Sequence, residues 1–348
     1  MIKPDQFKIA DYLNTTFSCS CGKEHSISLK QVELSAGAIN KLPTIIQQYG
    51  YQKVCVICDT NTYEVAGKKV MGILSQSNIQ AKHYMFRSTA LVPDEAACGT
   101  ILSNIDEGTD LIIAVGSGTI NDLCKFISYK VGLKYFIVAT APSMDGFASI
   151  GAPLIIDKLK VTYDTHSPQV IIGDLDVLCC APMDMITAGL GDILGKYTCL
   201  IDWKIAHIIN DEYYCETIVQ MVEHSISKVI NNASLVKSRD PKVIADIMEA
   251  LVLTGIAMGF VENSRPASGS EHHISHFWEM RFLFESKPPV PHGTKVGIGT
   301  IAILYLYHEL KNMQIDFRKA NSAAFLFDYE AWENRIKNTY GQAATGVI

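Results

Sequence analysis

Three consecutive segments decide the fold: DLIIAVGSG (110–118), TINDLCKFISYKVG (119–132) and KYFIVATAP (134–142). The first is a short apolar run that ends in glycines, as a buried strand does before a tight turn. The second has helical spacing and is closed by Gly132, and the third is another apolar run. Strand, helix and strand at this spacing predict a parallel βαβ unit within a doubly wound sheet.

The same alternation extends on both sides. Towards the N-terminus, the sequence predicts strands at 53–59 and 83–86 and helices at 61–76 and 93–105. Towards the C-terminus, two shorter β-like runs occupy 160–178, and beyond Ala181 long helical patterns dominate, at 182–209, 212–232, 241–260 and 296–310. We therefore predict a Rossmann-like α/β domain with a mostly parallel sheet at 1–179, followed by an all-α domain at 180–348. The active site should lie between them.

Composition narrows the class of protein. The 348 residues are 48% hydrophobic and 19% charged, a globular balance, and the net charge of −6 argues against a nucleic-acid surface. The start is polar, without a signal peptide, and we expect no apolar run to approach the length needed to cross a bilayer. The ten cysteines are interpreted mainly as buried thiols. These features predict a cytoplasmic protein without membrane insertion.

A glycine turn follows the strongest strand. Gly116-Ser117-Gly118-Thr119 lies between a strand and a helix, where glycines permit positive φ and the helix N-terminus offers amide groups to an anion. A pyrophosphate fits that chemistry. The turn is neither G-x-G-x-x-G nor a P-loop, so an interpretation as a plain βα turn stays open.

Two further strand ends carry polar residues. Asp59 closes an earlier strand, where a carboxylate accepts hydrogen bonds from a ribose or caps the next helix. In TAPSMDGFAS (140–149), Thr140 and Ser143 suit a cofactor groove, whereas Asp145 either contacts a ligand or merely serves its turn. Because ligands of such sheets bind beyond the carboxyl ends of the strands, these positions are the first to consider.

The helical half contains a candidate metal constellation. Asp192 lies inside an apolar helix, His272 and His276 share one helix face four residues apart, and His292 precedes a glycine. One carboxylate with two neutral imidazoles is a sound ligand set for a divalent metal with open positions. Surface or capping roles for the histidines stay open on this pattern alone, and His273 is the least favoured ligand of its run.

The N-terminal segment CSCGKEH offers Cys19, Cys21 and His25. These are half of a zinc knuckle, and the sequence shows no second half. Because structural zinc normally takes four ligands, we interpret the segment as a loop with incidental ligand types.

Five motifs occur together and in order: VGSGTINDLCKF (115–126), TAPSMDGFASIGAPLI (140–155), AGLGDILGKYTCLIDW (188–203), SRPASGSEHHISHFWEM (264–280) and HGTKVGIGT (292–300). From about residue 30 onward the chain resembles the bacterial sn-glycerol-1-phosphate dehydrogenases. These belong to the wider fold of iron-type alcohol dehydrogenases, glycerol dehydrogenase and dehydroquinate synthase. The CSCGKEH segment lies outside the family pattern.

The resemblance implies a role for each matched position. Asp192, His272 and His292 would bind one divalent metal ion (zinc, nickel or iron). Asp145, Asp192 and His276 would contact the substrate, with Asp145 and His276 as the catalytic groups. NAD(H) or NADP(H) would be held by Asp59, Gly116, Ser117, Gly118, Thr119, Ile120, Thr140, Ala141, Pro142, Ser143 and Ser149.

The implied activity is the NAD(P)-linked interconversion of sn-glycerol 1-phosphate and dihydroxyacetone phosphate by a homodimer. Lys196, Arg265 and Lys295 neighbour the motifs as unranked candidates for the substrate phosphate. The alternatives are a glycerol dehydrogenase, a cyclase like dehydroquinate synthase, and a nucleotide sensor without catalysis. The native metal and the choice between NAD and NADP stay open.

Overall fold

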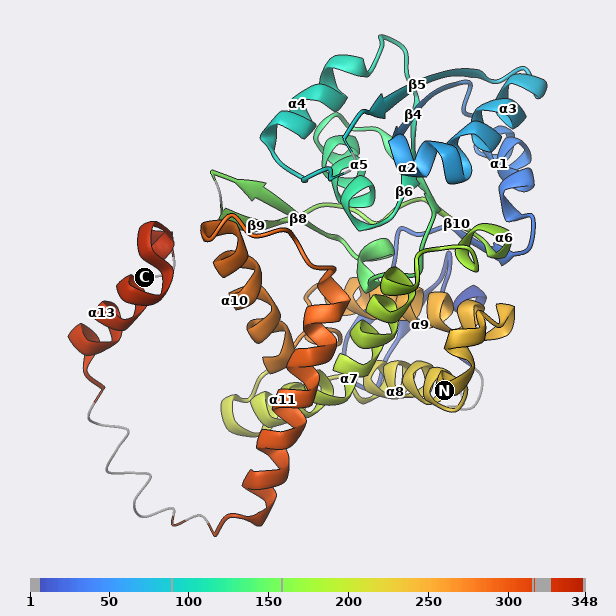
Figure 1. Cartoon of the computed structure of the whole chain (residues 1–348). Helices are drawn as coiled ribbons and strands as arrows, with labels where there is room; N and C mark the ends of the chain where they lie inside the picture. Colours follow the sequence, from blue (N-terminus) through green and yellow to red (C-terminus); the bar gives the residue numbers. More distant parts are fainter. Residues whose placement is uncertain (1–6, 89, 158, 315, 317–326, 347–348) are drawn as a thin grey trace.

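The computed structural model describes residues 7–88, 90–157, 159–314, 316 and 327–346. An α/β layer lies above a group of long helices, and the last helix, α13, lies to one side (Figure 1). The predicted succession of an α/β part and a helical part is confirmed.

One parallel sheet of six strands forms the α/β part, in the order β3-β10-β7-β6-β4-β5. Its strands are β3 (Gln31–Ser35), β4 (Lys53–Asp59), β5 (Gln80–Phe86), β6 (Leu111–Gly116), β7 (Lys134–Ala139) and β10 (Val170–Asp174). The chain runs outward from β4 to β5 and then returns to the other side of β4 with β6. This reversal makes a switch point at the carboxyl ends of β4 and β6, where doubly wound sheets bind nucleotides.

Helices cover both faces of the sheet. One face carries α1 (Leu42–Gln48) and α3 (Lys68–Gln76), and the other carries α4 (Glu95–Asn104) and α5 (Gly118–Lys130). Along β6, Ile112 and Ala114 join the core beneath α4 and α5, whereas Ile113 and Val115 join the core beneath α1 and α3. This alternation explains why β6 is apolar at every position, as strands covered on both faces are.

Several predicted elements differ in detail. The helix expected at 61–76 is α2 (Thr60–Thr62), a π-helical turn (Tyr63–Gly67) and then α3. The run KVTYD lies in β9 (Leu159–Asp164), which pairs with β8 (Gly151–Ile156) as a separate antiparallel hairpin rather than joining the main sheet. A second hairpin of β1 (Thr16–Ser18) and β2 (Glu24–Ser26) lies near the N-terminus and has no counterpart among the predicted strands.

The helical part follows a short α6 (Leu175–Leu178) and contains no strand among the described residues after 181. Its helices are α7 (Met183–Asn210), α8 (Glu216–Ile230), α9 (Pro241–Val261), α10 (Ser270–Phe284), α11 (His292–Asn312) and α13 (Tyr329–Tyr340). The N-terminal hairpin packs on α9, because the ring of Phe17 lies 5.4 Å from that of Phe260. The ring of Tyr12, just before the hairpin, lies 5.8 Å from the same ring. The division at residues 179 and 180 stays a prediction.

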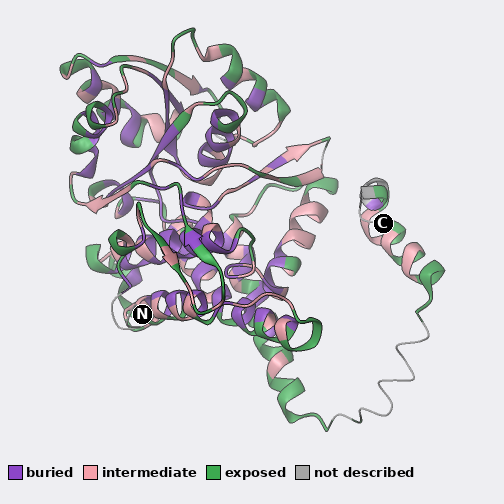
Figure 2. Ribbon diagram, turned by 180° about the vertical axis from the view of Figure 1, so that it is seen from behind, coloured by how far each residue is buried: buried purple, intermediate pink, exposed green. Residues whose placement is uncertain are grey.

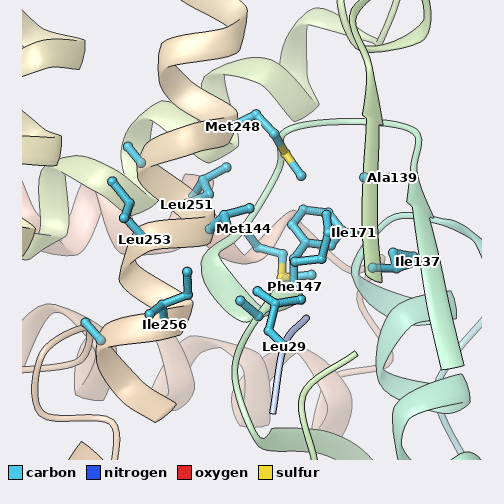
Figure 3. Close-up of a cluster of buried hydrophobic side chains, with 14 of the residues drawn as sticks. Leu29, Ile137, Ala139, Met144, Phe147, Ile171, Met248, Leu251, Leu253 and Ile256 are labelled. Carbon is cyan, nitrogen blue, oxygen red and sulfur yellow. The ribbon is translucent and has the colours of Figure 1, made fainter. Parts of the chain in front are cut away.

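A continuous core joins the sheet to α9. Ile137 and Ile171 from the sheet, Phe147 from the following loop, and Leu251 and Ile256 from α9 gather in one cluster (Figure 3). Burying each such side chain stabilises the fold by about 1.5–3 kcal/mol. The cluster therefore fixes the loop after β7 against the helices. This loop lies at the junction of the α/β part and the helical part.

Helix α9 corrects one sequence expectation. Contrary to the expectation that no apolar run approaches bilayer length, α9 is 21 residues long and has a mean hydropathy of 1.8 over an 18-residue window. However, 83% of that window is buried inside the protein, as in the core helix of a globular fold. Buried residues concentrate in the sheet and in the helices against it, and exposed residues line the outer helices (Figure 2).

Candidate active site

The glycine turn lies at the carboxyl end of β6 and contacts the loop after β7. Thr140 donates its backbone N–H to the carbonyl of Gly116 at 3.0 Å, and the hydroxyls of Ser117 and Ser143 lie 2.5 Å apart. Ser117 is the N-cap of α5 but makes no side-chain bond to the helix. The first amides of α5 are therefore left to a ligand, and an anionic pyrophosphate suits them.

The expectation that the two glycines adopt positive φ is wrong. Neither Gly116 nor Gly118 has a positive φ. Gly116 is needed for space, because a Cβ there would lie 2.6 Å from the Cβ of Ile120. A Cβ on Gly118 would meet only Met144, at 3.5 Å, which leaves the surface of the turn open to a ligand.

Asp59 caps a helix at the end of β4. Its carboxylate accepts a hydrogen bond from the amide of Thr62 at 2.8 Å, and its own amide donates to the Thr62 hydroxyl at 3.0 Å. The N-cap interpretation is thus confirmed. Only one carboxylate oxygen takes part, so a ribose contact at the other oxygen stays a prediction.

A buried lysine braces the loop after β7. Lys125 of α5 donates to the carbonyls of Gly146 and Gly151 at 2.7 and 2.9 Å and to the Ser149 hydroxyl at 3.1 Å. Burial lowers the pKa of Lys125 to about 8. Lys125 is not among the residues predicted from the sequence, although a lysine between apolar positions of the predicted helix is a usable signal. Asn121, one turn earlier on α5, donates to the same Gly146 carbonyl.

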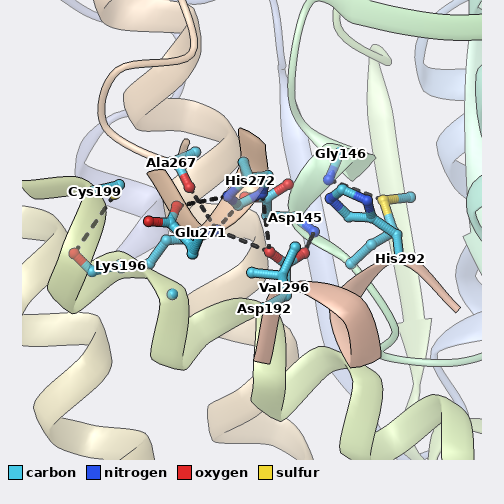
Figure 4. A network of polar contacts seen from close by, with 12 residues as sticks. Asp145, Gly146, Asp192, Lys196, Cys199, Ala267, Glu271, His272, His292 and Val296 are labelled. Atoms are coloured by element: carbon cyan, nitrogen blue, oxygen red, sulfur yellow. Dashed lines mark hydrogen bonds and ion pairs between the residues drawn. The ribbon is translucent and has the colours of Figure 1, made fainter. Parts of the chain in front are cut away.

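Asp192 lies at the centre of a buried polar network in the helical part (Figure 4). Its carboxylate accepts hydrogen bonds from the Asp145 amide at 3.0 Å and from Lys196 at 2.9 Å. Lys196 also pairs with the Asp145 carboxylate at 2.6 Å and donates to the Ala267 carbonyl at 3.0 Å. The predicted need of Asp192 for a partner is confirmed.

The charges of this network favour a cation. Burial opposes ionisation of Asp192, but Lys196 and the histidines outweigh it and lower the pKa of the carboxyl to about 2. Burial likewise opposes the charge of Lys196, but Asp145 and Asp192 raise the pKa of its ammonium group above the usual range. One cation thus faces two carboxylates, and a bound metal ion would offset the remaining buried negative charge.

The three predicted metal ligands come together. One ligand atom each from Asp192, His272 and His292 lies within 4.8 Å of the others. The Nδ1–H of His272 donates to Glu271 at 2.7 Å, and that of His292 donates to Glu279 at 3.2 Å. Each ring therefore keeps Nε2 as its ligand atom, the arrangement that metal-binding histidines use. The residues present fit a divalent metal ion, and the sequence analysis missed both glutamates.

Glycines bring these helices close enough for the ligands to meet. A Cβ on Gly293 would lie 2.0 Å from the carbonyl oxygen of Ala188, and one on Gly191 would lie 2.5 Å from that of Gly293. The first turn of α11 therefore lies directly on α7. This contact places His292 beside Asp192.

His276 faces the same space from α10. Its ring lies 6.2 and 5.8 Å from the rings of His272 and His292, and its Nδ1–H donates to Glu279 at 3.0 Å. Burial lowers the pKa of His276 to about 4, so the ring is neutral near pH 7. Its Nε2 is therefore an acceptor.

The ion pairs of the basic residues near the site distinguish the candidates for binding the substrate phosphate. Lys196 is ion-paired with both Asp145 and Asp192. Arg265 forms a bidentate ion pair with Glu212, at 2.5 and 2.6 Å. Lys295 lies beside the histidines and pairs with Glu279 at 3.1 Å. Lys160 of β9, which the sequence analysis missed, pairs with Glu279 and lies 3.3 Å from Nδ1 of His276.

The sequence is similar to a family of metal-dependent dehydrogenases and to curated members of it. The model of the iron-containing alcohol dehydrogenase family matches residues 33–182. A glycerol-1-phosphate dehydrogenase [NAD(P)+] of Halalkalibacterium halodurans is 38% identical over 86% of this chain and 76% of its own length. The Bacillus subtilis protein of the same name is 33% identical over 87% of this chain and 78% of its own.

The chain belongs to the glycerol-1-phosphate dehydrogenase family. Among solved structures, glycerol dehydrogenase from Schizosaccharomyces pombe has a TM-score of 0.68 at 18% identity, covering 80% of this chain and 71% of its own. A probable glycerol dehydrogenase from Sinorhizobium meliloti has a TM-score of 0.66 at 19% identity, covering 92% and 85%. These two structures confirm the predicted fold of this chain.

Proposed function

We propose that this enzyme interconverts sn-glycerol 1-phosphate and dihydroxyacetone phosphate with NAD(H) or NADP(H). The observation that carries the proposal is the meeting of Asp192, His272 and His292 beside Asp145 and near two lysines. The relatives that match most of the chain carry the name glycerol-1-phosphate dehydrogenase [NAD(P)+]. Both cofactor forms therefore stay open.

The cofactor would lie across the carboxyl ends of β4, β6 and β7. The amides at the start of α5 suit its pyrophosphate, and Asp59 suits its adenosine ribose. The Ser117–Ser143 contact and the bracing of the loop by Lys125 would hold the groove in shape. The predicted set extends from Thr119, Ile120 and Thr140 through Ala141 and Pro142 to Ser149.

A divalent metal ion held by Asp192, His272 and His292 would supply Lewis-acid polarisation of the substrate oxygen at C2. Asp145 would orient a substrate hydroxyl, since Lys196 fixes its carboxylate at 2.6 Å. His276, neutral and with Nε2 as acceptor, would accept a hydrogen bond or a proton from a substrate hydroxyl.

Lys160 and Lys295 would hold the substrate phosphate. Both lie against Glu279, which also anchors His276 and His292. Because the two lysines share this one carboxylate, a positive charge remains for a phosphate, unlike at Lys196 and Arg265. We expect Lys160→Met to raise the KM for dihydroxyacetone phosphate roughly tenfold, the loss of about one charge-assisted contact, while the rate with free dihydroxyacetone is unchanged. An equal loss with both ketones would remove Lys160 from the phosphate site.

The deciding experiment measures NADH and NADPH oxidation by metal-loaded enzyme with dihydroxyacetone phosphate or dihydroxyacetone, followed by chiral analysis of the product. The proposal requires a strong preference for the phosphate and formation of the 1-phosphate enantiomer. A preference for the free ketone would identify a glycerol dehydrogenase instead. Activity with neither would point to cyclase chemistry or to nucleotide sensing.

We infer a cytoplasmic homodimer from the family resemblance. Exposed apolar side chains on two neighbouring helices support an association surface, with Ile208 and Ile209 of α7 at 71% and 72% exposure and Ile301 and Tyr305 of α11 at 70% and 69%. Light scattering of wild type and of Ile301→Lys should give a dimer and a monomer. A monomeric wild type would contradict the inference.

A further inference from the structure

The second half of the N-terminal ligand set lies far along the chain. Cys19, Cys21 and His25 meet Cys215, the residue at the start of α8, and one ligand atom from each lies within 4.8 Å of the others. Cys215 and His25 are fully buried. This cluster lies outside the active site, and the proposed reaction makes no use of it.

We propose that Cys19, Cys21, His25 and Cys215 bind one structural zinc ion. Three thiolates and an imidazole form one of the closed, four-ligand sets that structural zinc adopts. Sulfur ligands also favour zinc over magnesium or calcium, which prefer oxygen. Cys215 supplies the second half that the sequence did not show, and the proposal takes the place of the interpretation of CSCGKEH as a loop with incidental ligand types.

The separations match a tetrahedral zinc site. With Zn–S of about 2.3 Å and Zn–N of about 2.0 Å, ligand atoms of a tetrahedron lie about 3.5–3.8 Å apart. The Sγ atoms of Cys19 and Cys215 are 3.6 Å apart, and Nε2 of His25 lies 3.4 Å from Sγ of Cys21 and 3.7 Å from that of Cys215. The side chains are thus already arranged around one point.

The hairpin supplies the first three ligands by its turn. Cys19 and Lys23 close the turn by a 3.0 Å backbone hydrogen bond, and the amide of Gly22 donates to the Cys19 carbonyl at 3.0 Å. Gly22 has a φ of 86°, which an L side chain rarely adopts. The turn brings Cys19 and Cys21 to the side on which His25 is buried.

Neighbouring groups orient the ligands. The Nδ1–H of His25 donates to the Phe260 carbonyl at 2.9 Å, which leaves Nε2 with the lone pair that a metal needs. The Tyr213 hydroxyl lies 3.1 Å from Sγ of Cys21, and the Thr217 hydroxyl lies 3.4 Å from Sγ of Cys19. Both hydroxyls can donate to a thiolate, as groups around a metal site do.

The consequence is a clamp between distant segments. The hairpin precedes the sheet, whereas Cys215 belongs to the helical part and lies 196 residues after Cys19. A zinc ion here would fasten the N-terminal hairpin to the start of α8. A disulfide between Cys19 and Cys215 is the competing use of the same atoms, and the test must separate the two.

The test is metal analysis with cobalt substitution in the full-length chain. Wild type should bind about two metal equivalents per chain, one at each cluster. Its cobalt form should show a sulfur-to-cobalt charge-transfer band, which the Asp192, His272 and His292 set cannot give because it has no sulfur. Cys19→Ser should lose one equivalent and most of this band, with a lower unfolding temperature.

Cys180→Ser is the matched control, because Cys180 is an exposed thiol outside the cluster. It should keep both equivalents and the band. Cys215→Ser should also lose one equivalent, but Cys215 is buried and its replacement could prevent folding. In that case, wild type is titrated with a mercurial reagent that modifies thiols, and an indicator dye measures the zinc released. Absence of the charge-transfer band in wild type, a Cys19–Cys215 disulfide in its mass spectrum, or full metal retention in Cys19→Ser would overturn the proposal, whatever the substrate proves to be.

Discussion

Among the residues that the structure describes, two clusters have the side chains to hold a metal ion, and they are built differently. The active-site cluster offers Asp192, His272 and His292, three ligands of oxygen and nitrogen. The N-terminal cluster offers three sulfurs and one nitrogen, a complete tetrahedral set. Three ligands leave room for a substrate oxygen, whereas four close the coordination shell.

Their surroundings differ in the same sense. Around Asp192 lie further ionisable groups, Lys196, Asp145, Glu271 and Glu279 with its lysines, which can position a charged substrate. Around the thiols lie aromatic rings: Phe17 is 5.2 Å and Phe260 5.7 Å from the ring of His25. A charged, open site suits chemistry, and a closed site with apolar neighbours suits structure.

The largest expected effect comes from Asp192→Asn. Because an amide oxygen is a much weaker ligand than a carboxylate, turnover should fall on the order of 10³-fold, the equivalent of several kcal/mol of transition-state stabilisation. Steady-state kinetics measures this loss, and metal analysis should show one equivalent missing. Retention of the thiolate-to-cobalt band in the same variant would show that the two clusters are independent.

Gly293→Ala should follow, with a loss on the order of 10²-fold in activity. Its Cβ would lie 2.0 Å from the Ala188 carbonyl oxygen, so α11 must shift and carry His292 away from Asp192. Gly72→Ala in α3 is the matched control, because a Cβ there meets nothing within 4 Å. The unfolding temperature and kcat should both be lower than in wild type only for Gly293→Ala. Equal losses in the two variants would refute the packing argument.

Metal removal should separate the clusters in time. A chelator should strip the three-ligand site first, because its open positions admit the chelator, and activity should fall while the unfolding temperature changes little. Later loss of the thiolate-bound ion should lower the unfolding temperature by on the order of a few degrees. Simultaneous loss of activity and stability would contradict the division of roles.

The smallest effect concerns pH. Burial lowers the pKa of His272, and Lys196 and the histidines lower the pKa of Asp192 to about 2, so these two ligands carry few protons near neutral pH. At the thiolate site, burial raises the pKa of Cys215 to about 12, so a metal ion must displace its proton at every pH between about 6 and about 8. Burial also opposes ionisation of Cys19, but hydrogen bonds to its neighbours outweigh burial and lower the pKa of that thiol to about 6. Dialysis against a weak chelator between about pH 8 and about pH 6 should therefore weaken the thiolate site several-fold more than the other. The reverse order would break the comparison.

The sequence by itself determined the parallel sheet, because alternation of apolar runs and helical spacing is encoded within short windows. It also pointed to Asp192, His272 and His292, since buried charge and histidine spacing stand out in apolar helices. Motif order gave the family, which the relatives at 33% and 38% identity confirm.

Only the tertiary structure decided what lies beside these residues. Glu279 joins two histidines to Lys160 across 119 residues, and Cys215 reaches His25 across 190. Local periodicity carries no record of such distances, because they depend on how helices and hairpins pack. The same is true of α9, which composition alone cannot distinguish from a membrane helix until its neighbours cover it.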